Sequence, residues 1–121
     1  MQILTKESLG VAVKKCQDSE HYRVLIVTKY AGDHTKILDY LSQVGANVVR
    51  CFGHPWARFL NGSTINIISS AYNTRGHKAN LVLYQEDIIN GNEEMLYVLK
   101  AIEIDNMRFN FLKNKELNKV K

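Results

Sequence analysis

The sequence predicts an α/β domain: a central, mostly parallel sheet with helices on both faces and one antiparallel hairpin strand. Segments with helical spacing of apolar residues alternate with short β-branched and aliphatic segments, which is typical of this layered class. Two short segments, residues 22–30 (YRVLIVTKY) and 79–87 (ANLVLYQED), are continuously apolar at their centres, as expected for strands covered on both faces. The dipeptide Asn61-Gly62 marks a hairpin turn.

Each predicted element has a local signal. Thr5 can cap the first helix, and Gly45 can end the second because glycine adopts the left-handed conformation without strain. Asn61-Gly62 predicts that residues 58–60 and 64–71 pair as antiparallel strands. In chain order, helices are expected over residues 5–21, 32–45 and 93–104, and strands over residues 22–30, 46–52, 58–60, 64–71, 79–87 and 106–112. No internal repeat interrupts this order.

Length and composition indicate one soluble domain. The 121 residues, 45% of them hydrophobic, suffice for one packed core. We assign residues 1–112 to this domain and residues 113–121, which contain four lysines, to a basic C-terminal tail. No stretch approaches the roughly 18 apolar residues of a membrane span, and the N-terminus has no signal-peptide apolar block. A cytoplasmic protein without a membrane partner is therefore expected.

Charge and cysteine usage limit the partners and cofactors. The net charge of +4 permits a polyanionic partner without requiring one. Cys16 and Cys51 are isolated from each other and from any zinc-like spacing, so we expect small, buried, reduced thiols. The four histidines are scattered. The sequence predicts neither a metal site nor a cofactor, and it leaves a homo-oligomer open.

Three segments in this order carry a resemblance to a known family. They are residues 23–30 (RVLIVTKY), 61–71 (NGSTINIISSA) and 74–87 (TRGHKANLVLYQED). Together they resemble the ATPase core of phage terminase large subunits and related helicase-like P-loop proteins, over about residues 5–90. The resemblance implies a P-loop-NTPase-like fold, a phage origin in a bacterial host cell, and an acidic pair, here Glu86 and Asp87, at the magnesium-binding position.

The phosphate-binding loop departs from that family's pattern. A Walker A loop needs glycines whose N–H groups wrap the phosphates, followed by Lys and then Ser or Thr. Lys6 and Ser8 precede a helix as those residues would, but Glu7 lies between them and no glycine precedes them. Too few residues remain for a full first strand and loop. Capping of a first helix explains Lys6 and Ser8 adequately without a phosphate.

The acidic pair departs as well. Glu86 precedes Asp87, whereas the family has Asp before Glu, and Asn80 replaces the family's Asp ahead of the strand. Exchanging the two side chains changes the carboxylate reach by one methylene and disturbs metal and water positioning. Glu86 and Asp87 are therefore weak catalytic candidates, and an ordinary cap or ion pair at a strand end is the alternative. Autonomous ATP hydrolysis is not expected.

The remaining candidate residues are basic or aromatic. Such residues can contact a nucleic-acid backbone, stack on a base or anchor a protein partner. Solvated loops and a partly buried tryptophan are the alternatives in each case. The candidates are Lys29, Tyr30, His34 and Lys36 after the first core strand, Trp56 and Arg58 in the turn-rich segment, and Arg75, His77 and Lys78 in the polar loop.

Three functions remain open from the sequence. The first is a non-hydrolysing, terminase/helicase-like domain that binds nucleic acid or a nucleic-acid-processing protein. The second is a phage accessory protein that binds a host protein and inhibits or redirects it. The third is a nucleotide-dependent ATPase fragment or subunit of DNA packaging, and only this function would use Mg-ATP, with Lys6 and Ser8 near the phosphates.

Overall fold

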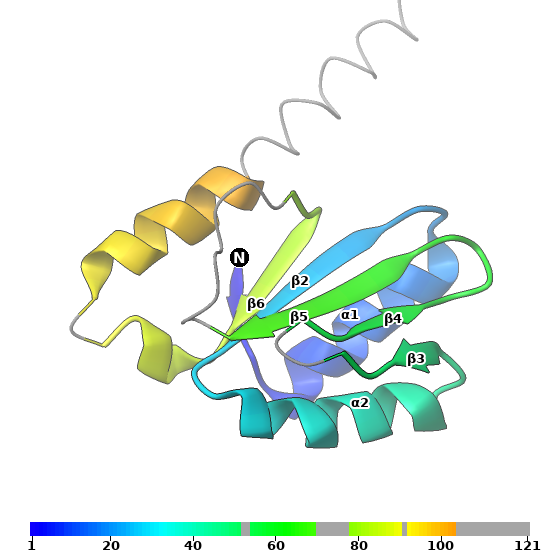
Figure 1. Cartoon of the computed structure of the whole chain (residues 1–121). Helices are drawn as coiled ribbons and strands as arrows, with labels where there is room; N and C mark the ends of the chain where they lie inside the picture. Colours follow the sequence, from blue (N-terminus) through cyan, green and yellow to red (C-terminus); the bar gives the residue numbers. More distant parts are fainter. Residues whose placement is uncertain (52–53, 70–77, 91, 104–121) are drawn as a thin grey trace, which may run out of the picture.

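The computed structural model describes residues 1–51, 54–69, 78–90 and 92–103. Six strands form one mixed sheet (Figure 1). Their spatial order is β1 (Gln2–Ile3), β6 (Leu81–Tyr84), β2 (Arg23–Thr28), β5 (Thr64–Ser69), β4 (Trp56–Arg58) and β3 (Asn47–Val49).

The sheet is parallel at its centre and antiparallel at one end. β1, β6, β2 and β5 are parallel neighbours, with Val24 opposite both Ile65 and Leu81 in the register. β4 runs against both β5 and β3. These pairings confirm the predicted mostly parallel sheet with one antiparallel hairpin strand. The continuous apolar runs fit the centre of the sheet, because β2 and β6 have neighbours on both sides.

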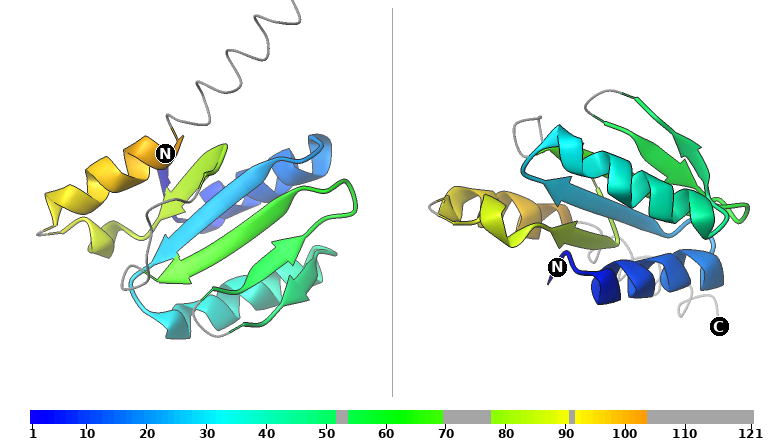
Figure 2. Two further views of the ribbon diagram at one scale, coloured as in Figure 1. Left: turned by 45° about the horizontal axis from the view of Figure 1, so that its top comes forward. Right: turned by 90° about the horizontal axis from the view of Figure 1, so that it is seen from below.

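Helices cover both faces of the sheet, as predicted. α1 (Lys6–Asp18) and α2 (His34–Gln43) pack on one face, and the helix of residues 93–103 packs on the other (Figures 1 and 2). Alternation along β2 explains the two cores: Val24 and Ile26 face α1 and α2, whereas Leu25 and Val27 face the third helix. The Glu103 carboxylate accepts a hydrogen bond from the Val82 amide at 2.9 Å, which ties that helix to β6.

The two capping predictions are confirmed. Thr5 and Ser8 form a capping box, in which the Ser8 amide donates to Thr5 Oγ1 at 3.0 Å and the Thr5 amide donates to Ser8 Oγ at 2.7 Å. Gly45 follows α2 with a φ of 93°. The amides of Gly45 and Ala46 donate to the carbonyls of Ser42 and Leu41, which is the Schellman arrangement.

The β4–β5 hairpin tip fastens the end of α1. The Gly62 amide donates to the Phe59 carbonyl, and Gly62 adopts a φ of 88°, so the loop is a three-residue turn with glycine in its left-handed position. Asn61 Nδ2 donates to the Cys16 carbonyl at 2.6 Å, and Ser63 Oγ donates to the Ser19 carbonyl at 2.6 Å. The predicted hairpin is therefore confirmed, and its polar tip satisfies carbonyls that the helix end leaves without partners.

Several boundaries differ from the sequence predictions. β1 exists despite the few residues before α1, because two residues suffice to pair with the end of β6. β4 covers Trp56–Arg58 in place of residues 58–60. β6 ends at Tyr84, and Glu86–Ile88 form a 3₁₀ turn, so the two acids do not lie at the strand tip. The predicted strand over residues 106–112 and the tail lie outside the described residues.

Two further expectations can be compared with the structure. Cys16 and Cys51 are free thiols, Cys16 fully buried and Cys51 half-buried. Among the residues that the structure describes, no helix is long and apolar enough to cross a membrane.

Candidate functional site

The carboxyl ends of the parallel strands bring several predicted residues to one edge of the sheet. Lys29 and Tyr30 follow β2, α1 begins at Lys6 after β1, and Glu86 and Asp87 follow β6. This edge is where open α/β sheets bind ligands. Lys29 Nζ lies 5.6 Å from the centre of the Tyr30 ring, so the cation already has an aromatic neighbour.

Hydrogen bonds between side chains and loops stabilise this edge of the sheet. Gln85 Oε1 accepts from the Lys29 amide at 2.7 Å, and Gln85 Nε2 donates to Asp33 at 3.3 Å. His34 is only 5% exposed, and its Nε2 lies 2.8 Å from Thr28 Oγ1. Burial lowers the His34 pKa, partly opposed by Asp33. His34 therefore supports the loop and does not present its ring to a ligand. No feature of the sequence indicated that Gln85 would contact Lys29 and Asp33.

The two candidate phosphate ligands differ in availability. Lys6 is exposed at the start of α1. Ser8 is 9% exposed, and its hydroxyl accepts from the Thr5 amide while donating to the Ile3 carbonyl at 2.8 Å. Its hydrogen-bonding capacity is largely used by the capping box. The connection from β1 to α1 contains only Leu4 and Thr5, so it is too short to wrap a phosphate group.

A different surface gathers the other predicted residues. Trp56 and Arg58 lie on the same face of β4, because Ala57 between them is fully buried toward α1 and α2. The strand register places further side chains beside them on this face, in two rows. One row contains Asn47, Arg58, Thr64 and Arg23, and the next contains Val49, Trp56, Asn66 and the buried Leu25.

We call the accessible part of these two rows the open sheet face. It consists of Arg23, Asn47, Val49, Trp56, Arg58, Thr64 and Asn66, all exposed or half-buried. The helix of residues 93–103 packs beside β6 at the far end of the sheet, away from β4 and β3 (Figure 1). Neighbouring strands are about 4.8 Å apart, so Arg58 and Arg23 are about 10 Å apart across β5.

The charged side chains described on the open sheet face are all positive. Its charged members are Arg23 and Arg58, and none of the described strand positions on it holds an acid. Arg50, by contrast, forms an ion pair with Asp39 of α2 at 2.7 Å and belongs to the helix-covered side. The face therefore combines cations, amides and one aromatic ring without a compensating carboxylate.

The remaining predicted residues are not gathered at one site. Lys36 lies on α2 and is exposed. Lys78 is exposed ahead of β6, two residues before Asn80, whose Oδ1 accepts from the Arg23 amide at 2.9 Å. Lys78 thus belongs to the end of the sheet where Arg23 begins β2. Arg75 and His77 lie outside the described residues.

The acids at the carboxyl edge have no further metal-binding side chains grouped with them in the described part of the chain. Glu86 and Asp87 are exposed in their 3₁₀ turn. Among the described residues, no group of three or more His, Cys, Asp or Glu side chains could hold a metal ion.

Fold and surfaces together define the class of the molecule: a small α/β domain with a mixed sheet, of which the described helices leave part of one face uncovered. Comparison with protein-family models, with curated proteins and with solved structures found no match for the chain. The function is therefore argued from the surfaces themselves.

Proposed function

We propose that the protein is a non-hydrolysing α/β domain that binds single-stranded nucleic acid through the open sheet face. One observation carries the proposal: Trp56 and Arg58 share a face of β4 with Asn66 and Arg23 alongside, and no acid occupies a described position there. Tryptophan offers a ring for stacking, arginine offers phosphate contacts, and asparagine offers donors and acceptors to base edges.

The composition of the open sheet face favours a single strand over a duplex. Sheet faces that bind RNA do so by stacking splayed bases on aromatic side chains. Trp56 is half-buried, so packing restricts its side chain while part of it stays accessible, which reduces the entropy lost when a base stacks on it. Lys78, beside the Arg23 end of the sheet, can extend the cationic path.

We also propose the finer classification, a P-loop-NTPase-like scaffold that acts by binding. Its support is that α1 starts two residues after a parallel strand and that Glu86 and Asp87 follow the neighbouring strand β6. The engaged Ser8 hydroxyl and the two-residue β1–α1 connection argue that this edge does not turn over ATP. Attachment to nucleic acid or to a nucleic-acid-processing protein is the use that we propose for this scaffold.

Fluorescence polarisation with labelled single-stranded oligonucleotides tests the proposal. Trp56→Ala should weaken binding by about 5- to 100-fold, as expected from the loss of one base–aromatic stack. Arg58→Gln should lower the slope of log affinity against log salt by about 0.7, the value for one phosphate contact on a single strand.

Two variants serve as matched controls. Tyr97 is an exposed aromatic residue on the third helix, and Arg50 is an exposed arginine on the helix-covered side. Tyr97→Ala and Arg50→Gln should bind like the wild type. Equal losses in all four folded variants, or no binding by the wild type at low salt, would exclude the open sheet face as a nucleic-acid site.

A further inference from the structure

A groove lies between α1 and α2, across the sheet from the open sheet face. It has a volume of about 640 Å³. Leu4, Leu9 and Ile37 form its apolar wall, while Lys6, Lys36 and Tyr40 supply its polar groups. We call it the helix groove. Since it lies on the other face, an inference about it does not rest on the proposed function.

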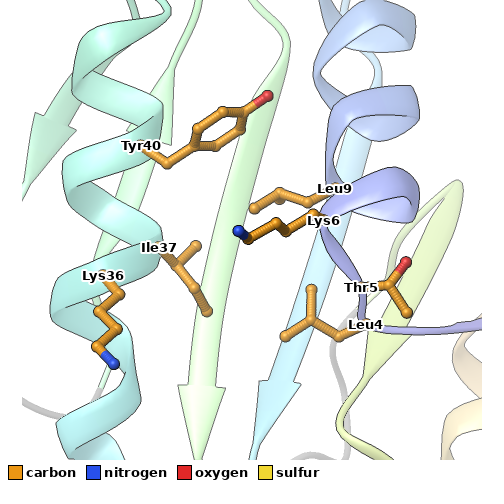
Figure 3. Close-up of a pocket in the computed structure, with 7 residues that line it drawn as sticks. All are labelled: Leu4, Thr5, Lys6, Leu9, Lys36, Ile37 and Tyr40. Carbon is orange, nitrogen blue, oxygen red and sulfur yellow. The ribbon is translucent and has the colours of Figure 1, made fainter.

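The apolar side chains of the helix groove converge, whereas Lys36 runs along α2 and does not point into the space between the helices (Figure 3). Figure 3 shows Leu4, Leu9 and Ile37 directed into the space between the helices, and the Lys6 ammonium extended from α1 toward α2. Leu9 and Ile37 are each 8% exposed, so the wall is the rim of the main core and is fixed by packing. Lys6 and Lys36 are exposed, and their flexible stems let the two ammonium groups adjust to a ligand.

The charge of the helix groove is positive and uncompensated. None of the described residues that line it is acidic. Asp39, three residues after Lys36 on α2, is already paired with Arg50 at 2.7 Å. Lys6 also lies in the first turn of α1, where the helix dipole favours anions. The groove is thus complementary to a molecule that is apolar along its length and anionic at one end.

We propose that the helix groove binds a small amphiphilic carboxylate, an aliphatic chain with one anionic head. The volume falls within the roughly 300–1,000 Å³ of small-molecule sites, and an apolar lining with a few polar groups is their usual composition. A protein partner would need about 20–30 residues on each side, far more than line this groove. The aliphatic chain packs on Leu4, Leu9 and Ile37, and the carboxylate accepts hydrogen bonds from the two lysines.

Titration of the full chain with decanoate, followed by NMR of the backbone amides, tests this site. The amides of Leu9, Ile37 and Tyr40 should shift and saturate. Decyltrimethylammonium has a tail of the same length and the opposite charge, so it should bind at least several-fold more weakly. Equal binding of the two probes, or shifts centred away from the groove, would overturn the proposal.

A double variant isolates the contribution of the head group. Lys6→Gln combined with Lys36→Gln should weaken decanoate binding by about 3- to 30-fold, the loss expected for two solvent-facing ion pairs. Lys100→Gln, an exposed lysine on the helix of residues 93–103 and outside the groove, is the matched control and should change nothing. Unchanged binding in the double variant would refute the site. If the groove amides shift with protein concentration and not with decanoate concentration, the groove binds a second copy of the chain. That result would also overturn the proposal.

Discussion

Replacing Asn61 by Asp should destabilise the fold strongly although the two side chains have almost the same shape. Asn61 Nδ2 donates to the carbonyls of Cys16 at 2.6 Å, Ser19 at 3.1 Å and Gln17 at 3.2 Å, while its Oδ1 accepts from the Ser63 amide at 3.0 Å. An aspartate keeps only the acceptor. It places a carboxylate against carbonyl oxygens at the negative end of the α1 dipole.

The size of the effect follows from these contacts. The two Nδ2 hydrogens are shared among the three carbonyls, so their loss counts as about two hydrogen bonds and costs about 1–3 kcal/mol. The charge at the helix end adds about 0.3–1 kcal/mol. The free energy of unfolding should therefore fall by about 1.5–4 kcal/mol, which is a large share of the 5–15 kcal/mol of an ordinary domain. At roughly 4 °C per kcal/mol, the Tm should drop by about 6–16 °C.

Thermal and urea denaturation at pH 7, followed by circular dichroism, measure the change. Asn47→Asp is the matched control, because Asn47 is an exposed asparagine on the outer strand β3. It should shift the Tm by no more than 1–2 °C, as surface substitutions do. If Asn61→Asp lowered the Tm no more than Asn47→Asp does, the Asn61 hydrogen bonds would not hold the hairpin tip to α1.

Three further outcomes are expected. Burial lowers the His34 pKa below its ordinary 6.5, so the unfolded chain binds a proton at a higher pH than the folded protein does. The free energy of unfolding should therefore fall as the pH drops below 6.5. Urea titrations from pH 7 to 5 should show this fall, with a smaller slope in His34→Gln. Gly10→Ala should raise the free energy of urea unfolding by about 0.5–1 kcal/mol, because alanine favours the helix and its Cβ lies an ordinary 3.9 Å from the Tyr40 hydroxyl. A lower free energy of unfolding would mean that the space between α1 and α2 cannot accept the added methyl group. Burial raises the pKa of the Cys16 thiol to about 12, so Cys16 should stay unreactive toward a thiol reagent until urea unfolds the chain, and rapid labelling of both cysteines in the native state would contradict its burial.

The sequence predicts the elements whose signals are local. The continuous apolar run of β2, the capping Thr5 and the glycine after α2 each depend on a few neighbouring residues, and all three predictions are confirmed. The hairpin at Asn61-Gly62 is confirmed for the same reason. The reach of Asn61 to α1 has no local signal, since it joins residues 45 positions apart.

Pairing between distant strands limits what the sequence predicts about surfaces. The two-residue β1 exists only because β6 lies beside it. The open sheet face depends on the register that places Arg58 opposite Thr64 and Thr64 opposite Arg23. Trp56 and Arg58 are selected as candidates from their chemistry, whereas Arg23 and Asn66 are not among the candidates. Alternation in residues 64–67, with Asn66 between two buried isoleucines, is the signal that could have found Asn66.

Quenching of tryptophan fluorescence is the most direct test of the central claim, because Trp56 is the only tryptophan in the chain. Titration with a single-stranded oligonucleotide at low salt should quench and shift its emission, since a base stacks on the ring. The change in emission should saturate, and the affinity derived from it should fall steeply as salt is added. The affinity should also be lower in Arg58→Gln. Saturable oligonucleotide binding without any change in Trp56 emission would place the nucleic acid elsewhere, and the absence of binding would contradict the account altogether.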